Sequence, residues 1–354
     1  MEMAQLLKIV VDKNASDLHL KVGKPPILRI DGRLGELDYP SLTPEDTERF
    51  MKSVTTPIHQ KRLQEIGGSD FGFSFGDEAR FRVAIFMEKG NIGIAMRLIP
   101  SKLMTFEEIG LPEKVKELLY RPRGLILVTG PTGCGKTTTL ATMLDYINTQ
   151  RECHIITVED PIEYYHEHKR SIVTQRELGA DVPSFKEGLV RALRQDPDVI
   201  LVGEMRDLAT MEAALMAAET GHLVFATLHT TGAAQTIDRV IDAFPVAQQE
   251  QIRTQMSFNM VGVISQQLLP RASGSGRVAA FEVMIAIPAI QSLIREKKTF
   301  RIASFIQTGG KHGMMTLDDH LVKLYKQGII SYDEVITRCS NVEDMKSKLE
   351  EITQ

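Results

Sequence analysis

The chain has 354 residues, enough for two or three domains, and its 43% hydrophobic and 25% charged residues are typical of a soluble globular protein. Its formal net charge of -4 argues against the overall basic surface that general nucleic-acid binders carry. No run approaches the roughly 18 apolar residues of a membrane span, so we expect no membrane insertion. The widely spaced Cys134, Cys153 and Cys339 indicate a reducing compartment, without disulfides or a cysteine zinc site.

We expect residues 1–100 to form an N-terminal domain that mixes helices and strands. Residues 1–12 predict an amphipathic helix whose apolar face carries Met3, Leu6, Leu7 and Val10. Two strands joined by the turn VGKPP follow, and residues 41–68 predict two helices, the first capped by Thr43. Residues 70–100 predict a β-meander, FGFSF, ARFRVAIFME and NIGIAMRLIP. Arg80, Arg82 and Arg97 lie in these strands and together form a candidate anion-binding face.

Residues 101–112 have the proline-bounded composition of an interdomain linker, and a second domain is expected over residues 113–287. There, predicted strands and helices alternate, which favours a parallel, doubly wound sheet. The strands are expected at 124–129, 154–159, 199–203 and 223–228, and the helices at 136–149, 184–194, 207–219 and 233–243. A long helix over 247–269, a strand over 278–285 and a helical C-terminal region over 288–354 complete the prediction.

The stretch RGLILVTGPTGCGKTTTL places a glycine-rich loop between a buried strand and a helix. It matches the phosphate-loop pattern GxxxxGK[ST], so we expect backbone N–H groups of the loop and the helix N-terminus to bind a polyphosphate. Lys136 is expected to reach the β- and γ-phosphates, and the Thr137 hydroxyl to bind Mg²⁺. The nucleotide-binding residues predicted here are Pro131, Thr132, Gly133, Cys134, Gly135, Lys136, Thr137 and Thr138.

Hydrolysis also needs a carboxylate near the γ-phosphate to hold Mg²⁺ or to orient water. Glu204 follows the buried strand in DVILVGEMRD and is the first candidate for both roles. Gly203 stands where many phosphate-loop enzymes carry an aspartate, so Glu204 would have to act without that aspartate. In HIITVEDPIEYYHEH a second strand ends at Glu159 and Asp160, and Glu163 follows shortly after. We expect this acidic turn to bind the metal and the attacking water, with Glu163 as its functional member.

The third stretch with candidate catalytic side chains is GHLVFATLHTTGAAQTIDR. His229 follows the predicted strand, where it could donate to a phosphate oxygen and couple that contact to the next helix. His222 precedes the same strand and is placed at the other end. His166 and His168 have HxH spacing, but no further ligand is apparent in the sequence.

Four boxes, GPTGCGKTTT, ITVEDPIEYYHEH, DVILVGEMRD and GHLVFATLHTTGAAQTIDRVIDAFP, resemble the Walker A, Asp, Walker B and His boxes of the type II and type IV secretion ATPase superfamily. The resemblance implies an α/β protein with a RecA-like ATPase core, a PAS-like N-terminal domain and a helical C-terminal region. It also implies a homohexameric ring with ATP at the subunit interfaces, into which Arg82 and Arg97 reach as arginine fingers.

Within this superfamily the chain most resembles the branch that drives type IV pilus retraction. That likeness implies an ATP- and Mg²⁺-dependent motor on the cytoplasmic face of the inner membrane. Its implied partners are a platform protein of the pilus and a paralogous retraction ATPase. Retraction members usually carry AIRNLIRE near the C-terminus, whereas this chain has Gln291 and Ser292 within AIQSLIRE. The apolar spacing of Ile290, Leu293 and Ile294 is kept, so we expect the fold there to persist.

Three other functions share part of this pattern. Pilus extension or type II secretion would use the same chemistry on a different partner, although an extension ATPase would carry a four-cysteine zinc site that three cysteines cannot form. A nucleic-acid translocase would use the same RecA-like core, but the chain shows no basic, aromatic-rich loop. A nucleotide switch without hydrolysis would not need the carboxylates.

Overall fold

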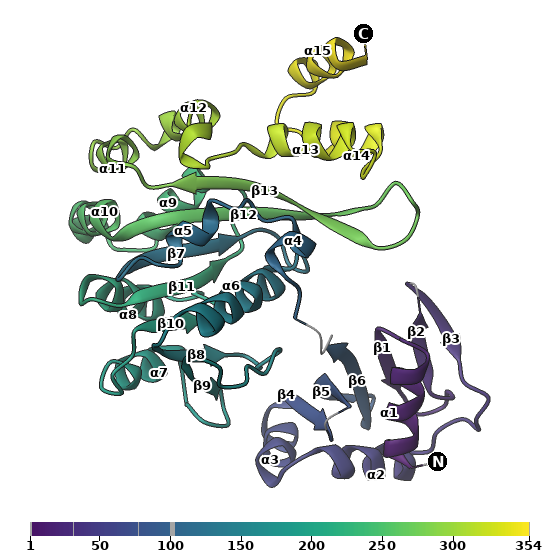
Figure 1. The fold of residues 1–354 in the computed structure, drawn as a ribbon. Helices are drawn as coiled ribbons and strands as arrows, with labels where there is room; N and C mark the ends of the chain where they lie inside the picture. Colours follow the sequence, from purple (N-terminus) through teal and green to yellow (C-terminus); the bar gives the residue numbers. More distant parts are fainter. Residues whose placement is uncertain (1, 31, 77, 100–102, 354) are drawn as a thin grey trace. The chain divides into compact units, whose positions relative to one another are not determined.

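The computed structural model describes residues 2–30, 32–76, 78–99 and 103–353 (Figure 1). The chain forms two compact units: the first joins Met1–Leu103 with Asp160–Tyr165, and the second joins Met104–Glu159 with His166–Gln354. Part of the expected linker, residues 101 and 102, lies outside the described residues. The rest contains a helix, α4 (Phe106–Ile109), which Thr105 caps and which buries Phe106 and Ile109 in the core of the second unit. Ordered structure of the second unit therefore begins before residue 113.

The first unit is a six-stranded antiparallel sheet with helices packed on one face. In chain order its elements are α1 (Met3–Asp12), β1 (Asp17–Leu20), β2 (Ile27–Ile30), β3 (Arg33–Glu36), α2 (Pro44–Val54), α3 (Pro57–Ile66), β4 (Gly68–Phe75), β5 (Ala79–Glu88) and β6 (Asn91–Ile99). The strand order is β3-β2-β1-β6-β5-β4. The apolar face of α1 and the residues Phe50 and Met51 of α2 share one core with alternate residues of β1, β5 and β6. The predicted helices and meander are confirmed, whereas β3 was missed.

The second unit is built on a seven-stranded sheet with the order β13-β12-β7-β11-β10-β8-β9. Its strands are β7 (Gly124–Thr129), β8 (His154–Glu159), β9 (Ile172–Glu177), β10 (Val199–Val202), β11 (Leu223–Leu228), β12 (Met260–Pro270) and β13 (Arg277–Ile285). Every neighbouring pair is parallel except β12 and β13. The predicted α/β class and parallel sheet are thus confirmed, and β9 is a strand that the prediction lacked.

Helices cover both faces of this sheet (Figure 1). They are α5 (Val115–Leu118), α6 (Lys136–Gln150), α7 (Phe185–Ala192), α8 (Leu208–Glu219), α9 (Ala233–Asp242) and α10 (Val246–Asn259). Because side chains alternate along a strand, Leu125 and Leu127 of β7 pack in a core with α8, α9 and α10. Ile126 and Val128 pack on the opposite face, against α4, α5 and α6. The sheet is therefore doubly wound, and each residue of β7 is buried.

The C-terminal region is helical, as expected. It contains α11 (Pro288–Arg295), α12 (Ile302–Thr308), α13 (Leu317–Lys326), α14 (Tyr332–Arg338), α15 (Val342–Thr353) and two short 3-10 helices, Thr299–Arg301 and Gly310–His312. In α11, Ile290 and Ile294 are fully buried, so the apolar spacing of the AIQSLIRE segment is used in packing. Within the described part of the chain, no helix has both the length and the apolar character needed to cross a membrane.

The predicted helix over 247–269 is wrong in its second half. Helix α10 ends at Asn259, and residues 260–270 form β12, which lies between β7 and β13. The β-branched Val261, Val263 and Ile264 favour a strand, and such a strand can be buried on both faces only because β7 and β13 flank it. This strand brings Ser265 and Gln266 to the edge of the sheet where the phosphate loop begins.

Candidate active site

The phosphate loop joins β7 to α6 and is shaped to surround an anion. Gly133 and Gly135 have φ angles of 76° and 90°, which only glycine adopts without strain. Gly135 is the N-cap residue of α6 and has no side chain with which to cap the helix. A helix that begins directly after such a glycine-rich loop presents the backbone N–H groups of its first turn, which is the arrangement of a phosphate-binding helix N-terminus.

Lys136 folds back over the loop that precedes it. Its Nζ donates to the backbone oxygens of Gly130 at 2.9 Å and Pro131 at 3.1 Å. Burial lowers the pKa of Lys136, and the neighbouring Cys134 and Glu204 offset only part of this effect. A bound polyphosphate would supply the missing negative charge, so the loop and its lysine fit such a ligand.

The predicted nucleotide-binding residues are contiguous here and differ in exposure. Pro131, Thr132 and Gly133 are exposed, Lys136, Thr137 and Thr138 are half-buried, and Cys134 is buried. Cys134 has its side chain inside the loop, and burial raises the pKa of its thiol. The surface of the loop is therefore open to a ligand, while its base packs on the sheet.

Glu204 and His229 meet beside this loop, as their positions after parallel neighbouring strands predict. The Nε2 atom of His229 lies 2.9 Å from Oε1 of Glu204, and its Nδ1 atom lies 3.4 Å from Oγ1 of Thr132. Arg206 also contacts Glu204, with Nε 2.7 Å from Oε1. His222 lies at the opposite end of β11, where its Nδ1 is 2.9 Å from the backbone oxygen of Ala217.

Glu204 is held in its charged form. Burial alone would raise the pKa of its carboxyl, but hydrogen bonds and charges from Arg206 and His229 outweigh that effect and lower it. A carboxylate at this place can accept a proton from water or bind a cation. Gly203 precedes it, and a Cβ there would lie 3.2 Å from the oxygen of Val158, so the missing aspartate would crowd β8.

The acidic turn after β8 separates into two parts. Glu159 is buried and accepts hydrogen bonds from Thr157 at 2.7 Å and from Gln175 at 3.2 Å, so its carboxylate is occupied within the sheet. Glu163 is half-buried and belongs to Asp160–Tyr165, which groups with the first unit. Its role in binding metal or orienting water stays a prediction.

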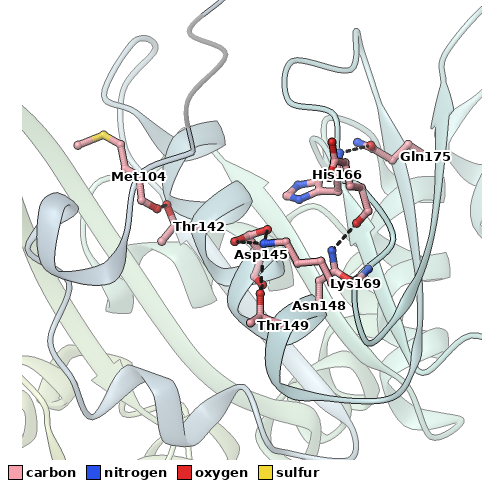
Figure 2. Close-up of polar contacts among 9 residues, drawn as sticks. Met104, Thr142, Asp145, Asn148, Thr149, His166, Lys169 and Gln175 are labelled. Atoms are coloured by element: carbon pink, nitrogen blue, oxygen red, sulfur yellow. Dashed lines mark hydrogen bonds and ion pairs between the residues drawn. The ribbon is translucent and has the colours of Figure 1, made fainter.

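The segment that follows this turn is fixed to α6 (Figure 2). Asn148 is fully buried; its Nδ2 donates to the oxygen of Glu167 at 2.7 Å, and its Oδ1 accepts from the N–H of Lys169 at 3.1 Å. The Nζ atom of Lys169 lies 2.7 Å from Oδ1 of Asp145 and donates to Thr149 at 3.2 Å. Residues 166–169 are thereby held on the helix that begins at the phosphate loop.

The three meander arginines of the first unit have different surroundings. Arg82 and Arg97 are opposite each other on β5 and β6, and both are exposed. Arg97 donates from Nε to Asp17 at 2.9 Å, although 69% of its side chain remains exposed. Arg80 is buried, with Nε donating to the oxygen of Ile162 at 2.7 Å and the guanidinium stacked on Tyr165. Arg82 and Arg97 keep accessible guanidinium groups, whereas Arg80 is used in packing.

A family model described as type II/IV secretion system protein matches residues 2–337. The chain belongs to this family. The resemblance found in the four sequence boxes is therefore confirmed.

Two curated proteins of this family are similar over most of their length. The type IV pilus retraction ATPase PilT of Pseudomonas aeruginosa is 49% identical over 331 residues, which cover 94% of this chain and 96% of that protein. The twitching motility protein of Neisseria gonorrhoeae is 46% identical over 320 residues, covering 90% and 86%. A crystal structure of the pilus retraction motor PilT with bound ADP is 48% identical, with a TM-score of 0.91 and coverage of 98% and 99%.

The sequence does not predict two residues that lie beside the candidate active site of this secretion-family protein. Arg206 lies two positions after Glu204, but an arginine at that spacing has no motif of its own. Gln266 donates from Nε2 to the oxygen of Cys134 at 2.6 Å, 132 residues away along the chain. The sequence predicts a helix at this position, and only the pairing of β12 with β7 places Gln266 near the loop.

Proposed function

We propose that this protein is a motor ATPase that hydrolyses ATP to retract a type IV pilus. The observation that carries the proposal is the likeness, over 98% of the chain, to a retraction motor solved with ADP. The described site supports it, because a phosphate loop, an ionised Glu204 and a histidine that contacts both lie together. A nucleotide switch would not need this carboxylate.

In the proposed reaction, the loop N–H groups and Lys136 bind the β- and γ-phosphates and stabilise charge that develops on them. Glu204 accepts a proton from the attacking water or orients it. His229 contacts Glu204 and Thr132 at once, so a change at the γ-phosphate can be passed to α9. The reaction cleaves the bond between the γ-phosphorus and the bridging oxygen and releases ADP and phosphate.

Mg²⁺ would supply charge neutralisation on the triphosphate. Within the described residues, no group of three or more His, Cys, Asp or Glu side chains is placed to hold a metal ion. We therefore assign Mg²⁺ mainly to the nucleotide oxygens and the Thr137 hydroxyl, with Glu204 and Glu163 as the carboxylates available to it. This donor set is all oxygen, which suits Mg²⁺.

The assembly we propose is a homohexamer in which Arg82 and Arg97 of one subunit reach the nucleotide of the next. Both side chains are exposed, which supports this role because an arginine finger must be accessible to transition-state charge. In Arg97 the Nε atom is paired with Asp17, so its contact with the nucleotide would use the other nitrogens of the guanidinium group or exchange this partner. We further propose residues 1–100 and 113–287 as the domains whose relative motion moves the pilus. Its partners would be an inner-membrane platform protein and a paralogous retraction ATPase, at the cytoplasmic face of that membrane.

Deletion of the gene tests the pilus role. Loss of a retraction motor leaves cells with excess pili that do not retract, and the wild-type gene restores retraction whereas a Glu204→Gln gene does not. Bald cells or a secretion defect would instead assign the protein to extension or secretion. DNA-stimulated, salt-sensitive hydrolysis would support the translocase alternative.

A further inference from the structure

Gln266 connects β12 to the base of the phosphate loop. It is only 2% exposed, and its Nε2 donates to the oxygen of Cys134 at 2.6 Å. A Cβ on Gly130 would lie 2.2 Å from the backbone oxygen of Gln266, so the strand and the loop are in direct contact. The other polar atom of this side chain, Oε1, is also buried, and it has no hydrogen-bond partner in the described part of the chain. The single strong contact of this amide is therefore with the loop.

The same place on the sheet also holds the start of α9. Oγ of Ser265 accepts from the N–H of Gly232 at 2.9 Å, and Oε1 of Glu282 accepts from the N–H of Ala233 at 2.7 Å. Ser265 and Glu282 are directly opposite in the β12–β13 pair. These contacts occupy N–H groups at the beginning of α9, shortly after His229.

We propose that Ser265, Gln266 and Glu282, together called the strand latch, set the position of the phosphate loop relative to His229. Gln266 is the positioning residue on the loop side, and Ser265 is the positioning residue on the α9 side. Since Thr132 and His229 lie 3.4 Å apart, a small shift of either segment would break their contact. This inference rests on the proposed ATP hydrolysis. It adds that the strand latch keeps the phosphate loop aligned with His229.

Variants on the two sides of the strand latch should lose different properties, ADP affinity on the loop side and turnover on the α9 side. Gln266→Met keeps the volume of the side chain but cannot donate to Cys134, so the loop loses its support and ADP affinity should fall about fivefold to tenfold. Ser265→Ala leaves the loop contact intact and frees the start of α9, so turnover should fall while ADP affinity stays near the wild-type value. Gln267→Met, at the next position of the strand, is the matched control and should change neither.

Titration with ADP, steady-state hydrolysis and apo-protein melting of the four proteins test the inference. A general packing defect would lower the melting temperature of the apo protein together with both ADP affinity and turnover. That result would overturn the proposed roles. Wild-type ADP affinity in Gln266→Met would also overturn them. If Gln266→Met does not fold, Gln266→Leu tests the same bond, because its apolar side chain cannot donate either, and it should show the same loss of ADP affinity. Failure of wild-type hydrolysis would instead reject the proposed function.

Discussion

The Nε2 atom of His229 lies 2.9 Å from Oε1 of Glu204, past the ends of the neighbouring parallel strands β11 and β10. The other ring nitrogen faces Thr132 of the phosphate loop at 3.4 Å. The imidazole of His229 thus contacts both Glu204, the carboxylate proposed to orient water, and the loop proposed to bind phosphate. This gives His229 a specific role in relaying a change at the nucleotide.

His229→Ala should lower turnover at least tenfold, because Glu204 loses a hydrogen-bonding partner and the loop loses its link to the strand. ADP affinity should change much less, since the loop N–H groups and Lys136 remain. Steady-state hydrolysis and ADP titration measure the two effects. His222→Ala, at the far end of the same strand, is the control; equal losses in both variants would mean that His229 has no special role.

Arg82→Ala and Arg97→Ala should each reduce hydrolysis by the assembled protein more than nucleotide affinity, because both are proposed to act on developing charge. Arg33→Ala provides the control, as Arg33 is an exposed arginine on β3, at the edge of the sheet opposite β4. Turnover and ADP binding should be measured at a protein concentration that keeps the ring assembled. Proportional losses of turnover and affinity would indicate plain binding instead of transition-state stabilisation.

Asn148→Leu should lower the free energy of unfolding by about 1–3 kcal/mol, because the buried Asn148 side chain makes part-buried hydrogen bonds to the backbone oxygen of Glu167 and the N–H of Lys169, and leucine makes neither. Lys169→Met removes the partly exposed ion pair with Asp145 and should cost less than about 1 kcal/mol. Urea unfolding of both variants measures the two losses. A larger loss in Lys169→Met would show that the ion pair, not the buried amide, holds this segment.

His320 predicts a pH dependence of stability. Burial and the charge of Lys323 lower its pKa from 6.5 to about 4. The N–H of Phe281 donates to the Nδ1 atom of His320 at 2.9 Å. Between these values the unfolded chain binds a proton that the folded chain does not, so stability falls as the pH falls from 6.5 to about 4. The full difference amounts to roughly 3 kcal/mol.

His320→Asn keeps an acceptor for the N–H of Phe281 but does not titrate. Its free energy of unfolding should therefore depend less on pH in this interval than that of the wild type. Urea unfolding at several pH values between 4 and 7 compares the two slopes. Identical slopes would show that His320 is not the titrating group.

The fold could be predicted wherever the signal was local. The phosphate loop, the capping of α2 by Thr43 and the alternation of strands and helices each depend on neighbouring residues, and the structure contains all three. The failure at β12 has the opposite cause. Residues 260–270 contain the β-branched Val261, Val263 and Ile264, but they are a buried strand because β13 and β7 flank them, and β7 lies more than a hundred residues earlier in the chain.

The candidate site shows the same division. Glu204 and His229 were predicted to be near the loop because each follows a strand of a parallel sheet, and the structure brings them together. Gln266 and Arg206 were missed, because their importance comes from contacts across the fold and not from a motif. Glu163, Arg82 and Arg97 belong to the first unit, so their part in hydrolysis stays a prediction.

The most direct test of the account is Mg²⁺-dependent phosphate release, measured together with ATP binding, for the wild type, Glu204→Gln and Lys136→Ala. The wild type should hydrolyse ATP, and Glu204→Gln should bind ATP with near wild-type affinity but turn over at least about 100-fold more slowly. Lys136→Ala should lose both binding and turnover. Substantial hydrolysis by either folded variant would contradict the assignment of this site as the ATPase centre.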